Sequence, residues 1–208
     1  GEIMDAGIRL SEITDEPHVY GIGAAAGLRG EIQIAEGEAW LAEVRDGDRV
    51  QTRRIGPSAS DSAAFLAVAR VPRWTSVDLR RKVPGDGFDD IVEEIVREAG
   101  LAELDAVPLV VEGRFSTLEL HVLNGQCPFA EGEPTVEGAG PPYRTTLAET
   151  KGLLVGFYSD TGGGRITHHG TRTHVHALVG PEADPVVGHV DGLELQPGAT
   201  IRVPATPR

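Results

Sequence analysis

The fold class follows from residues 31–44, which read EIQIAEGEAWLAEV. Apolar and polar side chains alternate over residues 31–35, which is the period of a half-buried strand. Residues 36–38, Glu-Gly-Glu, have the composition of a turn, and residues 39–44 return as the partner strand. The stretch therefore predicts a β-hairpin.

The composition extends this interpretation to the whole chain. Of 208 residues, 27 are glycine and 14 are proline, which favours many turns and short strands over a helical bundle. The 40% of hydrophobic residues suffices for a core, and the length suits one domain or two small ones that share a core. We expect an N-terminal part at 1–130 and a C-terminal β part at 143–208, joined by a loop rich in proline, glycine and glutamate.

The clearest helix lies at residues 87–99, where apolar residues recur at helical spacing from Phe88 to Ala99. Asp86 suits its N-cap and Gly100 its end, and we expect this helix only to cover the core. Residues 61–69 are predicted to form a second, short helix. Further strands are predicted at 49–52, 76–79, 108–111, 116–122, 152–158, 173–179, 186–190 and 200–203.

Several function classes are disfavoured by the charge and by missing patterns. The net charge of −13 repels phosphate backbones and anionic lipids, so we expect neither nucleic-acid nor membrane partners. A lone cysteine, Cys127, excludes an internal disulfide and a cysteine-rich zinc module. No apolar run approaches the ~20 residues of a membrane span. Because no signal-peptide pattern opens the sequence, we expect a cytoplasmic protein, with a signal peptide further upstream left open.

Five of the seven histidines lie between positions 168 and 189. His174 and His176 fall in a strand-like segment, which sends both to one face, roughly 6.5–7 Å apart. His189 follows after a hairpin-length loop and is expected beside them. Three neutral imidazoles suit Zn²⁺ or a similar ion, with a fourth position open for water or substrate. The alternative is a surface His-x-His without function, and His168 and His169 are expected in an exposed loop.

Glu31, at the start of the first predicted strand, is a further candidate. Its carboxylate suits a metal ligand or a proton-transfer group near a metal. A solvated glutamate at a strand edge remains the alternative. The nearby Gly21-Ile22-Gly23 does not predict a dinucleotide site, because a strand follows rather than a helix. These glycines instead favour close approach to a neighbouring strand or a ligand.

The order of several motifs resembles the α-acetolactate decarboxylase family over roughly residues 7–203. The motifs are Tyr20-Gly21-Ile22-Gly23, Leu28-Arg29-Gly30-Glu31, Glu36-Gly37-Glu38, Gly113-Arg114-Phe115-Ser116, Pro142-Tyr143, Leu147-Ala148-Glu149, Leu154-Val155-Gly156-Phe157, His174-Val175-His176 and Gly188-His189-Val190. The resemblance implies a two-part α/β (α+β) fold of mixed β-sheets with few helices. It also implies zinc held by His174, His176 and His189. The implied reaction decarboxylates a branched 2-hydroxy-3-oxo acid through an enediolate, with Glu31 handling the proton.

Two positions depart from the family pattern. An arginine that orients the substrate in the family aligns with His121, which lacks the forked pair of donors and faces the substrate in its place. The family's second acidic residue, from an extended C-terminal segment, has no counterpart before Arg208. The first departure weakens or changes recognition of the substrate carboxylate, and together they alter half of the polar catalytic set while the metal ligands remain.

Three functions follow as hypotheses. The first is a zinc-dependent lyase, related to acetoin-forming enzymes, that acts on a small oxo acid in a homodimer. The second is an isomerase or cyclase of specialised metabolism that uses the same metal site. The third is a non-catalytic descendant that binds a metal or a small molecule. The histidine motif also resembles a class of ferredoxin-like domains found in nucleic-acid-associated proteins, which the acidic charge disfavours.

Overall fold

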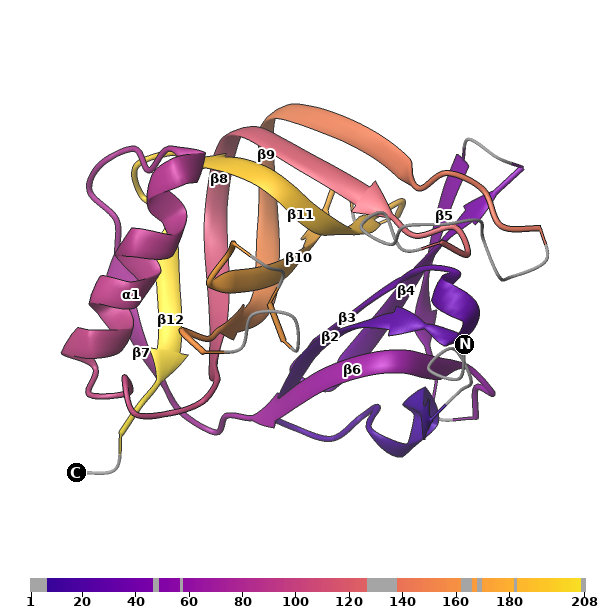
Figure 1. Ribbon diagram of the computed structural model, residues 1–208, viewed down its shortest axis with the longest axis horizontal. Helices are drawn as coiled ribbons and strands as arrows, with labels where there is room; N and C mark the ends of the chain where they lie inside the picture. Colours follow the sequence, from indigo (N-terminus) through magenta and orange to yellow (C-terminus); the bar gives the residue numbers. More distant parts are fainter. Residues whose placement is uncertain are drawn as a thin grey trace.

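A computed structural model describes residues 7–46, 49–56, 58–126, 138–161, 166–167, 170–181 and 183–206. Within these residues, the strands form two six-stranded sheets, accompanied by one α-helix and short 3-10 helices (Figure 1). The expected β-rich fold with few helices is confirmed. The pairings in the described part are all antiparallel rather than mixed. Several consecutive strands, such as Glu31–Ala35 and Glu38–Arg45, are joined by short connections, which permit only antiparallel pairing.

The first sheet, sheet A, contains the predicted hairpin, β3 and β4, at its centre. Its strands are β1 (Ile8–Arg9), β2 (Val19–Ala25), β3 (Glu31–Ala35), β4 (Glu38–Arg45), β5 (Arg49–Ile55) and β6 (Ser62–Arg70), in the order β1-β6-β2-β3-β4-β5. The turn between β3 and β4 places Glu36 and Gly37 at positive φ, 50° and 80°, as a two-residue hairpin turn requires.

The second sheet, sheet B, curls so far that part of it closes on itself. Its strands are β7 (Trp74–Asp78), β8 (Val107–Val122), β9 (Tyr143–Tyr158), β10 (Thr173–Val179), β11 (Val186–Leu195) and β12 (Thr200–Pro204), in the order β11-β10-β9-β8-β12-β7. The outer strand β11 also pairs with the second half of β8. Strands β8 to β11 therefore form a closed ring, and β12 and β7 extend it.

Helix α1 (Phe88–Glu98) covers sheet B at the end away from sheet A (Figure 1). Its buried residues are Phe88, Val92, Ile95 and Val96, and they pack in one cluster with side chains of β8, β9 and β12. The helix thus forms within one residue of the predicted bounds and on the predicted apolar stripe. It begins after Gly87, and Asp86 makes no side-chain cap.

The two sheets meet across apolar side chains from both. Tyr20 and Ile22 of β2 pack with Val110 of β8 and Val155 of β9. Within sheet A, β2 lies close against β6: a Cβ on Gly23 would lie 2.3 Å from the Phe65 carbonyl oxygen. The predicted role of the glycines in close strand approach is confirmed.

Two predictions differ from the structure. Residues 62–70 form strand β6 where a helix was predicted at 61–69, because pairing with β2 outweighs the helix propensity of their alanines. The strands predicted at 108–111 and 116–122 are one continuous strand, β8, since residues 112–114 keep their pairing with β9. Sheet A takes its strands from residues 8–70, and sheet B takes its strands from residues 74–204. Cys127, His168 and His169 lie outside the described residues.

Candidate metal centre

The three motif histidines converge on the face of sheet B that meets β3. His176 on β10 lies directly opposite His189 on β11, so the predicted hairpin arrangement is confirmed. His174 projects from the same face of β10, two residues earlier. One ring nitrogen from each of His174, His176 and His189 lies within 4.8 Å of the others, and all three side chains are buried.

Backbone carbonyls fix the orientation of two of these rings. Nδ1 of His176 lies 2.9 Å from the carbonyl oxygen of Ile32 on β3, and Nδ1 of His174 lies 2.6 Å from that of Ile166. A carbonyl oxygen only accepts, so each Nδ1 carries the hydrogen and donates it. In the neutral rings the lone pair is consequently on Nε2. This is the usual way in which a metal-binding histidine is held from behind.

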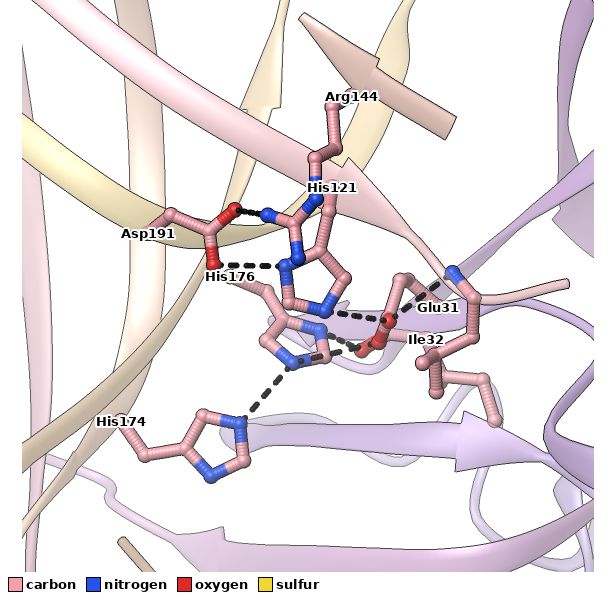
Figure 2. Close-up of polar contacts among 8 residues, drawn as sticks. Glu31, Ile32, His121, Arg144, His174, His176 and Asp191 are labelled. Atoms are coloured by element: carbon pink, nitrogen blue, oxygen red, sulfur yellow. Dashed lines mark hydrogen bonds and ion pairs between the residues drawn. The ribbon is translucent and has the colours of Figure 1, made fainter. Parts of the chain in front are cut away.

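The two Nε2 atoms then face each other, 3.3 Å apart (Figure 2). Two lone pairs at this distance repel unless a cation lies between them. A tetrahedral zinc ion with Zn–N bonds of about 2.0–2.1 Å separates two ligand nitrogens by about 3.3–3.4 Å. The donor set and its spacing therefore fit a zinc-like ion.

Neighbouring elements hold the start of β10 in place. Asp89 of α1 accepts hydrogen bonds from the backbone N–H of Arg172 at 2.7 Å and from the Thr173 hydroxyl at 2.5 Å. On the other side, the ring of Phe65 stacks on that of His174, with centroids 6.0 Å apart. Helix α1, for which we expected only a core-covering role, thus also anchors the segment that carries His174.

Glu31 lies beside the histidines and is buried, which excludes the solvated strand edge as its setting. Its Oε2 lies 3.5 Å from Nε2 of His176, and its Oε1 accepts a hydrogen bond from the Leu123 N–H at 3.3 Å. Burial raises the pKa of this carboxyl from 4.5 to about 8. The Leu123 N–H opposes the rise in pKa, and Asp191 adds to it. At neutral pH the carboxyl therefore holds its proton in the metal-free protein.

His121 lies in the same site, on β8. It pairs in register with His189, and the two ring centroids are 4.6 Å apart. Its Nε2 lies 3.8 Å from Oε1 of Glu31, and its Nδ1 lies 2.8 Å from Oδ1 of Asp191 (Figure 2). The residues proposed from the sequence, Glu31 and His121, are thus both beside the histidine cluster. His18 is not part of this cluster, because its half-exposed ring lies next to Glu36 in a turn of sheet A.

Two polar residues of this region were not predicted. Asp191 on β11 contacts His121, and Arg144 on β9 lies 2.6 Å from the other oxygen of Asp191. The spacing Gly-His-Val-Asp at 188–191 could have indicated Asp191, since it follows His189 by two residues. Nothing local in the sequence indicates Arg144, because its place depends on the pairing of β8 with β9 over a long connection.

Comparisons with known proteins agree with this architecture. The sequence profile described as alpha-acetolactate decarboxylase matches residues 2–206. The structure is similar to alpha-acetolactate decarboxylase from Bacillus subtilis strain 168, with TM-score 0.69 and 20% identity over 97% of this chain and 79% of that one. It is also similar to a Staphylococcus aureus protein of unknown function that resembles alpha-acetolactate decarboxylase, with TM-score 0.68 and 14% identity over 97% and 78%. A search of curated protein sequences returned no significant match.

None of the described helices is long and apolar enough to cross a membrane.

Proposed function

The chain belongs to the alpha-acetolactate decarboxylase family, and from this premise we propose that it is a zinc-dependent carboxy-lyase. Membership of the family and the shared fold support a decarboxylase-like enzyme. The proposed substrate is a small 2-hydroxy-3-oxo acid, and the products are CO₂ and a hydroxyketone. The proposed enzyme thus decarboxylates acetolactate to acetoin, or a close relative of acetolactate to the corresponding hydroxyketone.

The facing Nε2 atoms of His174 and His176 are the observation that carries this proposal. With His189 they form the candidate ligand set, and their Nδ1 atoms are already used by backbone carbonyls. A zinc ion held there would act as a Lewis acid toward the ketone and hydroxyl oxygens of the substrate and would stabilise the enediolate left by loss of CO₂. Loss of CO₂ occurs without a redox change, so no further cofactor is needed.

Glu31 is the proposed proton donor. Decarboxylation of a carboxylate leaves the electron pair of the broken C–C bond on the substrate, and one proton must be added to that carbon. Glu31 is buried beside His176, so its carboxyl can deliver that proton where bulk water is excluded. After each turnover Glu31 must take up one proton again, which keeps protons in balance.

His121 is the proposed substrate-facing residue opposite Glu31. Its Nε2 and Oε1 of Glu31 are 3.8 Å apart, too far for a direct hydrogen bond. A substrate hydroxyl placed about 2.8 Å from both atoms would donate to Nε2 of His121 and form a second hydrogen bond with Glu31. Because Nδ1 of His121 lies 2.8 Å from Asp191 and carries the ring hydrogen, Nε2 accepts from a substrate hydroxyl and does not hold a substrate carboxylate as the fork of an arginine would.

We propose a homodimer for the assembly. The outer strands β5 and β7 each pair on one side only within the described sheets, and an unpaired strand edge is a natural site for contact with a second copy. Light scattering of the purified protein tests this, because a particle with the 22.0 kDa mass of one chain would contradict it.

The test of the reaction is product analysis with racemic acetolactate. The purified protein is loaded with one equivalent of zinc, and acetoin and CO₂ are both measured, with His176→Ala as the metal-site control. We expect both products from the wild type and neither from the control. A rearranged acid without CO₂ would indicate the isomerase instead. No conversion by the zinc-loaded protein of any 2-hydroxy-3-oxo acid tested would contradict the lyase.

A further inference from the structure

Polar side chains from the two neighbouring strands, β9 and β11, form a chain of contacts that ends at His121. Arg144 on β9 lies directly opposite His121 of β8 in the strand register, and Asp191 comes from β11 on the other side. The contacts form a chain in which Arg144 lies 2.6 Å from Asp191, and Asp191 lies 2.8 Å from Nδ1 of His121 (Figure 2). The chain runs from a half-exposed guanidinium to a buried imidazole.

A β-bulge places Asp191 in this chain. Along the β8–β11 pairing, Val190 lies opposite Leu120 and Gly192 lies opposite Glu119, so Asp191 is the extra residue between them. In an unbroken register Asp191 would lie opposite Glu119, and two carboxylates facing each other would repel. The bulge turns Asp191 toward His121 instead, and bulges near functional sites often redirect a side chain in this way.

The contact with Asp191 determines how the imidazole of His121 is presented. A carboxylate oxygen only accepts, so Nδ1 of His121 carries the hydrogen of the 2.8 Å contact. Arg144 holds the second oxygen of the same carboxylate and keeps the carboxylate from rotating. Nε2 of His121 is then the ring nitrogen that faces Glu31 and the interior.

We propose that Asp191 and Arg144 are positioning residues that fix the ring orientation and tautomer of His121, so that its Nε2 contacts the substrate beside Glu31. This inference rests on the proposed function for the identity of the substrate. Neither residue needs to touch the substrate. Their effect on binding and turnover passes through His121, which distinguishes them from residues that only stabilise the fold.

A double-mutant cycle tests this dependence. The probe is 2,3-dihydroxy-2-methylbutanoate, the dihydroxy acid obtained when the ketone of acetolactate is reduced, and its binding to the zinc-loaded protein is measured by calorimetry. We expect Asp191→Ala to weaken binding about 10- to 100-fold, by analogy with the loss of residues that orient metal-binding histidines. In a His121→Ala background the same change should have less than about a 2-fold effect, because the residue it acts through is gone.

Two controls separate positioning from folding. Asp191→Asn keeps an oxygen that can accept from Nδ1, and we expect it to recover much of the binding lost in Asp191→Ala. Glu194 lies on β11, as Asp191 does, and forms an exposed ion pair with Lys82. Glu194→Gln removes this ion pair and should leave binding of the probe unchanged. Zinc content is measured in all variants, and we expect it to stay at the wild-type level.

The proton on Nδ1 of His121 gives a readout that does not depend on turnover. In NMR spectra of ¹⁵N-histidine-labelled protein, we expect a hydrogen-bonded Nδ1–H signal that disappears in both His121→Gln and Asp191→Ala. If the signal persists in Asp191→Ala, or if Asp191→Ala weakens binding equally in both backgrounds, the positioning role is wrong. A protein that binds the probe and keeps the signal but does not decarboxylate acetolactate would contradict the proposed function and leave the positioning role standing.

Discussion

The imidazole of His176 connects the two sheets, because its Nδ1 on β10 donates to the carbonyl oxygen of Ile32 on β3, 2.9 Å away. The opposite nitrogen of the same ring points at His174. One side chain therefore belongs both to the packing between the sheets and to the candidate metal site. The position of β3 relative to β10 consequently sets the geometry of the site, and metal binding should in turn stabilise the sheet packing.

Zinc should therefore raise the thermal stability of the protein. A ligand that binds only the folded state at 100 times its dissociation constant contributes about 2.7 kcal/mol. We expect the midpoint of thermal unfolding to rise by several degrees when zinc is added to chelator-treated protein. The measurement is calorimetry or circular dichroism, with His176→Ala as the control. A similar rise in that variant would mean that zinc binds elsewhere.

Glu31→Gln should abolish most of the turnover while zinc is retained. The amide has nearly the same shape but supplies no proton, and loss of a general acid typically costs about 10²- to 10⁴-fold in rate. Acetoin formation is followed with zinc-loaded protein, and zinc is quantified in the same samples. Turnover within about 2-fold of the wild type would show that the proton comes from another group.

The contribution of the buried Glu31 carboxyl to the stability of the metal-free protein should fall as the pH rises from about 5 to about 8. Because burial raises the pKa of Glu31 from 4.5 to about 8, the folded state holds a proton that the unfolded chain has released. This contribution to the free energy of unfolding is complete below pH 4.5 and is lost as the pH rises to about 8. Glu31→Gln lacks it.

Urea unfolding in the presence of a chelator, at several pH values, measures this contribution. We expect the stability of Glu31→Gln relative to the wild type to increase across this range. The comparison with the variant removes the contributions of the histidines, which both proteins share. A difference that stays constant with pH would contradict the protonated state of the buried carboxyl.

Gly23→Ala should destabilise the fold and weaken zinc binding together. A Cβ at this position would lie 2.3 Å from the backbone oxygen of Phe65, and the ring of Phe65 stacks on His174. Overpacking of this kind costs about 1–3 kcal/mol. Gly56→Ala is the matched control, because no atom lies within 4 Å of its Cβ. Equal urea midpoints for the two variants would show that β2 and β6 separate without cost.

Much of this site could be predicted because the patterns that indicate its strands and its hairpin each lie within a few consecutive residues. The alternation in residues 31–35 and the strand-like composition of residues 173–179 indicated these strands, and the hairpin-length loop before His189 indicated the pairing of β10 with β11. Residues 61–69 were predicted wrongly, since their alanines suit a helix and only the neighbouring strand β2 determines otherwise. The sequence did not decide whether Glu31 is buried, because its burial depends on sheet B, which packs over β3.

The contacts of His121 could not be predicted for a related reason. Asp191 reaches it through a bulge, and Arg144 reaches it through the register of two 16-residue strands. The spacing of Asp191 after His189 places it near the site, but neither the bulge nor the register of β8 with β9 has a local sequence signature. Long-range register places these groups, and a shift of one residue would send each side chain to the other face of its strand.

The most direct test of the metal centre is X-ray absorption spectroscopy at the zinc edge on protein loaded with one equivalent of zinc. We expect three imidazole nitrogens at about 2.0–2.1 Å together with one oxygen ligand, and loss of one imidazole in the His189→Ala variant. A zinc ion surrounded only by oxygen, or one whose spectrum is the same in that variant, would contradict a centre built from His174, His176 and His189.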